Sequence, residues 1–473
     1  MSSKLRKIYA VMPVSVQNLM MSVRGWSFNR RRYRKEYPQY FDNLMRSQWF
    51  SGEQFRDLQT AELRKLIKEA AQNVPYYRKT LGKFLNKLDS FTLDNLKDIP
   101  IVDKSVFRAN IEEFTNPERL KFGCDKSESS GTTGVPLVMQ YDFDSTQHSF
   151  AFRERQYRWA GITGKEKSAR FSSRVIMGRH NQAPYWRYNA AEKQWLFSTY
   201  HINEKTIPQY YEALKRFNCA YLDGYPSSIF EIAKWVNRAG KSRQWRLWAV
   251  ITTAETLLDF HREEIERAFG CPIYNFYSSS EGAPWITQCA AGNMHINPES
   301  GIVEFLRPDG KYAQPGQEAE MVITGFFQRT APLIRYRIAD TAVLAENQSC
   351  PCGREMPVIE YIGGRQAECL HSTERGWVSG AAVSGVLLAV NERLNGSQIE
   401  QVDTDSFILR YIPNGTPLNQ QETSIVLERF YKRLGRSIDI KFEVVDEIPR
   451  GPAGKSRQFI GLPAEKLKSL KND

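Results

Sequence analysis

The chain has 473 residues, long enough for two or more domains, and its 41% hydrophobic content is typical of a globular protein. Nine of its twelve net positive charges belong to residues 1–35, which hold no acidic residue, so the nearly balanced remainder argues against a nucleic-acid-binding surface. Seven cysteines, an odd number, indicate a reducing, cytoplasmic compartment, and no apolar run approaches the roughly 20 residues that span a bilayer.

The first predicted elements form a basic, amphipathic helical segment over residues 1–60. Apolar residues recur at helical spacing from Leu5 to Val23, and Pro13 suits the first turn of a second helix. Arginines and a lysine cluster at 30–35. An apolar stripe beside basic residues can lie on an anionic membrane, so we expect peripheral contact of residues 1–35 with the inner membrane face. The alternative is a helix packed on the protein body with a solvated basic end.

The middle of the chain mixes helical and strand-like patterns. Residues 61–72 and 226–239 are predicted to form amphipathic helices. Strand-like runs occur at 249–253, 272–276 and 320–324, with helical segments between several of them. This alternation favours layered α/β architecture.

Past Glu368 the pattern changes to that of a compact α+β unit of about a hundred residues. The expected elements are a helix at 382–393, strands at 398–403 and 406–412, a helix at 419–434 and a strand at 438–445. We therefore expect a large α/β domain followed by a small α+β domain.

A glycine- and hydroxyl-rich loop lies between the predicted helices 61–72 and 226–239. Its sequence is Ser129-Ser130-Gly131-Thr132-Thr133-Gly134. Glycine permits positive φ and close approach of a ligand, and successive N–H groups can form a concave anion site. The pattern therefore indicates a phosphate-binding loop, although the lysine of the Walker motif is missing. The alternative is a polar surface turn.

Together with this loop, later segments resemble the acyl-adenylate-forming superfamily of acyl-CoA synthetases, peptide-synthetase adenylation domains and luciferases. In chain order these are Thr252-Thr253-Ala254-Glu255, Tyr277-Ser278-Ser279-Ser280-Glu281, Tyr336-Arg337-Ile338-Ala339-Asp340, Gly364-Arg365 and the proline- and glycine-rich stretch 449–457. Residues 47–51, 73–78, 225–228 and 350–354 are similar to the phenylacetate–CoA ligase branch, especially its relatives from capsular polysaccharide gene sets.

The resemblance implies an AMP-binding domain over 61–366 and a mobile lid domain over 367–473. It implies an ATP-dependent ligase that activates a carboxylic acid as acyl-AMP, releases pyrophosphate, and passes the acyl group to CoA. One alternative is transfer to an amine or amino sugar in surface polysaccharide assembly. Another is a non-catalytic, membrane-associated scaffold.

Both reactants are anions, so the site must hold phosphate and offset negative charge. We expect residues 129–134 to hold the leaving phosphates, and Glu281 to hold Mg²⁺. Asp340 can accept hydrogen bonds from both ribose hydroxyls. Lys455 is the main catalytic candidate, as a mobile charge between carboxylate and α-phosphate. The remaining candidates for binding ATP or AMP are Ala254, Glu255, Tyr277 (beneath the adenine), Ser278, Ser280, Arg337 and Arg365.

Three positions depart from the family pattern. Ala339 replaces a glycine before Asp340, a change that costs little only where φ is negative. Ser278 replaces the glycine that follows the adenine-binding tyrosine. Ala367 stands where the family has an aspartate hinge. We expect adenylation to tolerate all three changes. The alanine at the hinge position, Ala367, instead leaves domain rotation before the second half-reaction an open question.

A separate group of residues has the composition of a structural metal site. Cys350 and Cys352 form a close pair, and Cys289 and His295 lie upstream. Three cysteines and a histidine are a common zinc-binding set, and four protein ligands leave no open position for catalysis. The alternative is a group of free thiols, with His295 capping a turn.

Overall fold

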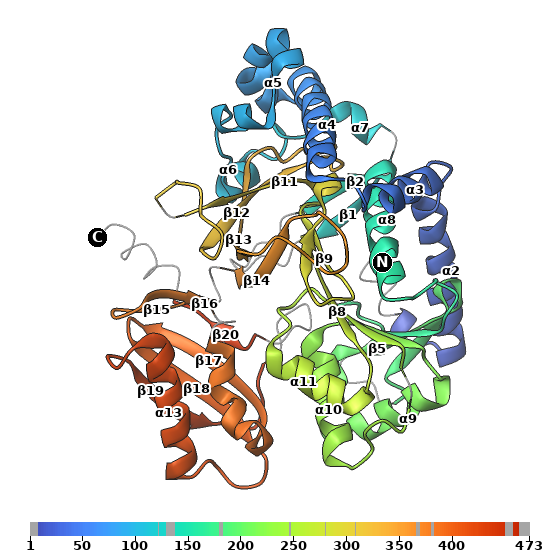
Figure 1. Cartoon of the computed structure of the whole chain (residues 1–473). Coiled ribbons are helices and arrows are strands. Elements are labelled where there is room, and N and C mark those ends of the chain that lie inside the picture. Colours follow the sequence, from blue (N-terminus) through green and yellow to red (C-terminus); the bar gives the residue numbers. More distant parts are fainter. Residues whose placement is uncertain are drawn as a thin grey trace.

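The computed structural model describes residues 8–121, 123–128, 138–178, 183–245, 247–279, 281–307, 309–365, 369–379, 383–449 and 457–462. A long mixed sheet runs through the body of the protein, and a smaller sheet lies below it at the C-terminal end (Figure 1). The expected fold class, layered α/β followed by α+β, is confirmed. The predicted boundary between residues 366 and 367 lies outside the described residues.

Helices dominate the first 160 residues. They are α2 (Val14–Arg32), α3 (Tyr37–Ser47), α4 (Gly52–Asn73), α5 (Pro75–Leu81), α6 (Lys104–Ala109), α7 (Pro117–Leu120) and α8 (Phe143–Trp159), with 3₁₀ turns at Gly82–Ser90 and Leu93–Asp98. Helix α4 is longer than the predicted 61–72, because Ser51 and Gln54 form a capping box that starts it nine residues earlier. It ends before Pro75, which has no N–H to continue the helix.

The main sheet has 12 strands. Their order is β11 (Gly301–Leu306), β12 (Glu318–Gly325), β13 (Tyr336–Leu344), β14 (Val358–Arg365), β10 (Met294–Ile296), β9 (Trp285–Gln288), β8 (Ile273–Ser278), β7 (Ala249–Thr253), β6 (Tyr221–Gly224), β3 (Ser168–Ser172), β5 (Gln194–Ser198) and β4 (Trp186–Asn189). From β5 to β8 the neighbouring strands are parallel. Helices α9 (Ile207–Phe217), α10 (Pro226–Arg238) and α11 (Asp259–Phe269) connect these parallel strands.

Strand β7 shows why this part of the chain was predictable. All five of its residues are buried, and it coincides with the predicted run 249–253. A strand covered on both faces is a continuous apolar and β-branched run, and the sequence Ala-Val-Ile-Thr-Thr is of that kind. The other two predicted strands of the body are present but longer, as β8 and β12.

The C-terminal unit has a four-stranded sheet in the order β19 (Asp439–Val444), β18 (Ser406–Pro413), β17 (Leu394–Asp403) and β20 (Phe459–Ile460), with α13 (Gln420–Leu434) packed beside it. A two-stranded sheet, β15 (Cys369–Ser372) and β16 (Gly376–Ser379), precedes it. The predicted helix at 382–393 is present as a 3₁₀ helix over Ser384–Arg393. One glycine and two valines lower the α-helical propensity of this segment.

The C-terminal unit contacts the body through α10. The guanidinium of Arg238 donates to the side-chain oxygen of Asn395 at 2.6 Å and to the carbonyl of Leu394 at 3.1 Å. Lys234, which is buried, also donates to the Leu394 carbonyl. The start of β17 is thereby tied to one helix of the body.

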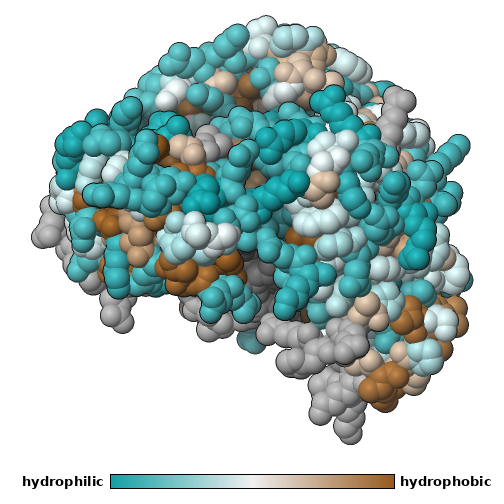
Figure 2. Space-filling model, turned by 90° about the horizontal axis from the view of Figure 1, so that it is seen from below, coloured by the Kyte–Doolittle hydropathy of each residue, from teal (hydrophilic) through white to brown (hydrophobic). Residues whose placement is uncertain are grey.

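Most of the surface seen from below is hydrophilic, with a few separate hydrophobic patches (Figure 2). Among the described residues, no helix is both long and apolar enough to cross a bilayer.

His261 of α11 makes stability depend on pH. Its ring is buried against Phe230 and Phe260, and its Nδ1 has no hydrogen-bond partner. Burial, with a smaller effect of the Lys234 charge, lowers the pKa of His261 to about 3. The pKa of this histidine in the unfolded chain is about 6.5. Between pH 3 and pH 6.5 the unfolded chain therefore binds a proton at His261 that the folded protein does not, and the free energy of unfolding falls as the pH drops below about 6.5.

The free energy of unfolding of the wild type should fall between pH 7.5 and pH 5. In His261→Phe we expect this fall to be smaller by about 2 kcal/mol. Urea unfolding of wild type and variant at both pH values measures this difference. An equal loss in the two proteins would contradict the assignment.

Candidate functional site

The predicted nucleotide-binding residues gather where parallel strands end. Strands β6, β7 and β8 run in the same direction, so Gly224, Thr253 and Ser278 stand at one edge of the sheet. Open α/β sheets bind ligands at this edge. Gly224 has a φ of 143°, and a Cβ atom there would lie 1.8 Å from the carbonyl oxygen of Phe171, so no side chain fits.

Ala254 and Glu255 follow β7 directly. The Glu255 carboxylate accepts a hydrogen bond from the backbone N–H of Ser227 at 3.1 Å, at the start of α10. A carboxylate beside a helix N-terminus is favoured by the exposed N–H groups and the helix dipole. This contact joins the loop after β7 to the loop after β6.

Tyr277 and Asp340 are brought together from positions far apart in the sequence. The hydroxyl of Tyr277, on β8, donates to the carboxylate of Asp340, on β13. Asp340 is buried, and it lies opposite Arg365 of β14 in the antiparallel ladder. The carboxylate expected at the ribose therefore lies beside the ring expected at the adenine.

The residue before Asp340 is strained. Ala339 has a φ of 65°, in the left-handed region, where an L-residue costs roughly 1–2 kcal/mol. The low cost expected for alanine in place of glycine depended on a negative φ, and that condition is not met. Ala254 is strained in the same way, with a φ of 68°.

Glu281 has a partner that the sequence did not reveal. Its carboxylate is nearly buried, and its Oε1 lies 3.2 Å from the Nζ atom of Lys104, at the start of α6. Nothing local marks Lys104, because a lysine in a first helical turn is ordinary in any surface helix. Only the packing of α6 beside β13 brings it to the site.

Arg337 lies between two acidic side chains. Its Nε is 3.2 Å from a carboxylate oxygen of Asp103, and its Nη1 donates to Glu320. Both contacts hold the guanidinium between β12 and the segment before α6.

Several predicted site residues fall outside the described parts of the chain: Ser129, Ser130, Gly131, Thr132, Thr133, Gly134, Ser280 and Lys455. The backbone of Arg365 ends β14. The ends of the 129–137 segment are described, because β1 (Cys124–Glu128) pairs with β2 (Val138–Asp142) in antiparallel register. The candidate phosphate loop thus connects two paired strands.

Strand β2 leads from this loop toward Glu281. Burial and the nearby Glu281 carboxylate raise the pKa of Tyr141, so its hydroxyl stays protonated. The amide of Gln328 donates to the Gln140 carbonyl at 2.8 Å. The strand that follows the candidate loop in the sequence therefore lies near the candidate magnesium ligand.

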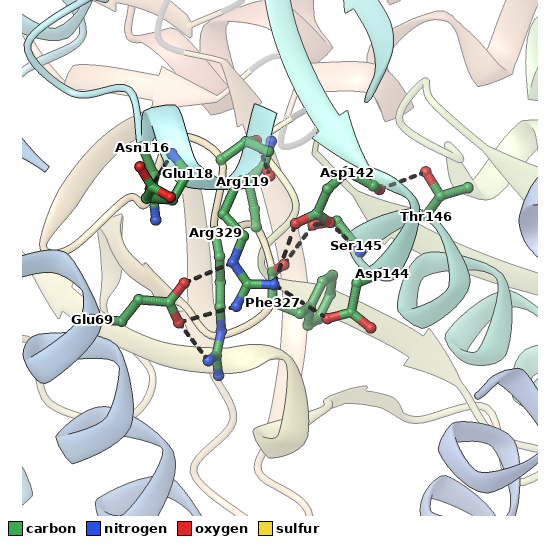
Figure 3. A network of polar contacts seen from close by, with 12 residues as sticks. Glu69, Asn116, Glu118, Arg119, Asp142, Asp144, Ser145, Thr146, Phe327 and Arg329 are labelled. Carbon is green, nitrogen blue, oxygen red and sulfur yellow. Dashed lines mark hydrogen bonds and ion pairs between the residues drawn. The ribbon is translucent and has the colours of Figure 1, made fainter. Parts of the chain in front are cut away.

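A polar network fixes the far end of β2 (Figure 3). The Asp142 carboxylate caps α8 by accepting from the Ser145 N–H at 2.7 Å, and it lies 3.6 Å from Arg119. Arg119 and Arg329 both bind Glu69 of α4, at 2.7 and 2.9 Å. Although burial acts to raise it, these two arginines hold the pKa of Glu69 below its usual range. The strand that follows the candidate loop is thus held by three helices.

The four residues of the candidate metal site meet in space. The sulfur atoms of Cys289, Cys350 and Cys352 and a ring nitrogen of His295 all lie within 4.8 Å of one another. The Cys289 and Cys350 sulfurs are 3.7 Å apart, and the Cys352 sulfur is 3.4 Å from His295 Nε2. Tetrahedral zinc with ordinary bond lengths requires edges of about 3.8 Å between sulfurs and about 3.6 Å between sulfur and nitrogen.

Neighbouring groups orient this cluster. His295 Nδ1 lies 3.2 Å from the Met356 carbonyl, which leaves Nε2 to face the sulfurs. A side-chain N–H of Asn293 donates to the Cys350 sulfur at 3.1 Å. Burial raises the pKa of the Cys289 thiol to about 11, so the protein alone does not favour its thiolate. The contact of His295 Nδ1 with the Met356 carbonyl is of the kind that orients zinc-binding histidines.

Comparison with known proteins shows similarity along the whole chain. Residues 370–461 match the family model of the CapK C-terminal domain. Protein CapK of Staphylococcus aureus is 27% identical over 457 residues, which cover 96% of this chain and 98% of that protein. The phenylacetate–coenzyme A ligase of Escherichia coli K12 is 25% identical, over 68% of this chain and 73% of that protein.

Two further similarities bear on the fold and the acceptor. The indoleacetate–lysine synthetase of Pseudomonas savastanoi is 26% identical, over 55% of this chain and 63% of that protein. A crystal structure of 2-hydroxyisobutyryl-CoA ligase in the postadenylation state superposes with a TM-score of 0.70, at 16% identity, and covers 90% of this chain and 93% of that one. The resemblance to the acyl-adenylate-forming superfamily and its phenylacetate–CoA ligase branch is thereby confirmed.

Proposed function

We propose, from the premise that this chain is a relative of CapK and of adenylate-forming CoA ligases, that it activates a carboxylic acid as an acyl-adenylate. The observation that carries the proposal is the meeting of Tyr277, Asp340 and Glu281 around one edge of the sheet. Tyr277 and Glu281 come from one family motif, and Asp340 comes from another. Tyr277 lies in β8, Glu281 follows that strand, and Asp340 lies within β13.

In this proposal the acid's carboxylate attacks the α-phosphorus of ATP, a new C–O–P linkage forms, and pyrophosphate leaves. Asp340 binds the ribose hydroxyls, and Tyr277 lies against the adenine. Residues 129–134 hold the leaving phosphates through N–H and hydroxyl donors. Lys455 places positive charge where negative charge builds up in the transition state.

The residues around Glu281 suit Mg²⁺. The carboxylate is nearly buried, and Lys104 is its one recorded ionic partner among the described residues. When bound, the ion would neutralise phosphate charge, with Glu281 as its protein ligand. Ala254, Glu255, Ser278, Ser280, Arg337 and Arg365 complete the proposed nucleotide site.

For the second half-reaction we propose CoA as the acyl acceptor, in line with the acid–CoA ligases that the chain resembles. An amine or amino sugar is the second candidate. It is favoured by the likeness to a synthetase whose name joins an acid to lysine.

We further propose that Cys289, His295, Cys350 and Cys352 hold one structural zinc ion. The argument is the match between the two measured ligand separations and the edges of a zinc tetrahedron. With four protein ligands the ion would be closed to substrate.

Pyrophosphate exchange into ATP, measured over a panel of aliphatic, aromatic and hydroxylated acids, tests adenylation. We expect exchange with at least one acid class, and product formation from that acid only when CoA is added. Product formation with an amine and without CoA would favour the second candidate. Tight ATP binding with no exchange on any acid would contradict adenylation and support a non-catalytic scaffold.

A further inference from the structure

Helix α2 lies on the protein with its polar side inward. Gln17 and Ser22 are buried, and Ser22 Oγ accepts a hydrogen bond from the Ala190 N–H at 3.0 Å. The side-chain oxygen of Asn18 accepts from the Tyr188 N–H at 2.9 Å. At Gly25 the helix backbone approaches Asn189 so closely that a Cβ atom would lie 2.3 Å from its side-chain oxygen.

The opposite side of α2 is apolar and faces outward. Val16, Leu19, Val23 and Trp26 follow one another at spacings of three and four residues, and are 37%, 60%, 54% and 51% exposed. The helical turn at 8–11 and Met12 extend the stripe, with Ile8 49% and Val11 81% exposed. Surface helices normally show the reverse pattern, with the apolar stripe toward the core.

This stripe occupies the edge of the molecule on which α2 lies. In Figure 1 the helix stands at the right-hand side of the molecule. Exposed apolar surface that is contiguous along one helix marks an interaction site more often than scattered single residues do.

The charges that residues 8–35 themselves carry are all positive. Residues 8–35 contain no aspartate or glutamate. Arg24 and Arg30 are exposed on the helix, and Arg34 and Lys35 are exposed just beyond it. Arg31 and Arg32 instead pair with Asp125 and Glu192 of the body, which fixes the end of the helix.

We propose that this outward face of α2, Val11 to Trp26 with Arg24 and Arg30, binds the surface of a membrane that contains anionic lipid. The apolar side chains enter the boundary between headgroups and acyl chains, and the arginines meet lipid phosphates. The helix lies in the plane of the surface. Because its polar side is already bonded to the body, docking brings the whole folded protein to the membrane.

A second copy of the chain is the main competing occupant. Pairing two such helices would place the exposed arginines of one beside those of the other, or against an apolar stripe that offers no carboxylate. Anionic lipid is complementary in both respects, since it supplies negative charge and apolar surface together.

Co-sedimentation of the full chain with vesicles tests the proposal. We expect binding to vesicles of phosphatidylcholine with about one-third phosphatidylglycerol, and about tenfold weaker binding to phosphatidylcholine alone. The triple variant Leu19→Ser, Val23→Ser, Trp26→Ser should weaken binding to the anionic vesicles on the order of tenfold or more.

A matched control carries Trp248→Ser, Ile425→Ser and Val444→Ser, three exposed apolar residues outside α2, and should bind as wild type does. Circular dichroism and thermal unfolding show that each variant is folded. Equal binding by the α2 variant and the control would overturn the proposal. So would a wild-type dimer in sedimentation velocity that the α2 variant alone abolishes, without any vesicle binding.

Discussion

Lys455→Ala should lose most acyl-adenylate formation, on the order of a hundredfold or more in rate, with little change in ATP binding. A charge that acts mainly in the transition state affects the rate more than ground-state affinity. The measurement is single-turnover formation of the adenylate, with ATP affinity determined separately. Transfer from preformed acyl-AMP should be spared if the C-terminal domain, which the resemblance implies is mobile, rotates this lysine away after the first step.

Two comparisons make this result specific. Lys432→Ala removes an exposed lysine from α13 of the same domain and should leave adenylation unchanged. Asp340→Ala should instead raise the ATP concentration required, since ribose contacts exist before the transition state. Adenylation at the wild-type rate in Lys455→Ala would refute the role given to this lysine.

The double variant Cys350→Ser, Cys352→Ser should lose its zinc and several kcal/mol of folding stability, because a structural metal contributes its binding energy to the folded state. Elemental analysis of protein purified without chelators should give about one zinc per wild-type chain, as one closed tetrahedral site requires. Chelator treatment of the wild type should lower its unfolding temperature in the same direction.

Cys124→Ser is the matched control, because Cys124 is half-buried, contacts Gln140 and lies away from the cluster. It should keep both metal and stability. A metal content that does not change in the double variant would exclude these four residues as the binding site.

The fold was predictable where one local pattern decides the element. The apolar run of β7 and the helical pattern over 419–434 gave bounds within a residue of those observed for β7 and α13. The 3₁₀ type of the helix at Ser384–Arg393 could not be predicted, because its apolar spacing resembles that of an α-helix. Strand order in the main sheet was also beyond reach, since it depends on packing between elements distant in sequence.

The candidate site divides in the same way. Motif spacing identified Tyr277 and Asp340, and the structure brings them into contact. Lys104 was missed because its partner Glu281 lies 177 positions away. The positive φ of Ala339 was missed because alanine gives no sign of left-handed backbone. The four candidate metal ligands were identifiable by residue type alone, although their meeting depends on the pairing of β10 with β14.

That pairing has a mechanical consequence. The sulfur cluster lies beside Val358, the first residue of β14, and Arg365 ends the strand seven residues later, about 23 Å away and next to the expected domain boundary. If the C-terminal domain rotates about the boundary between residues 366 and 367, the residues on the body side of that boundary must keep their position. β14 is paired with β13 on one side and with β10 on the other, and zinc at the proposed site would also fix its first residues. The strand that leads to the expected boundary would then keep its position if the C-terminal domain rotates.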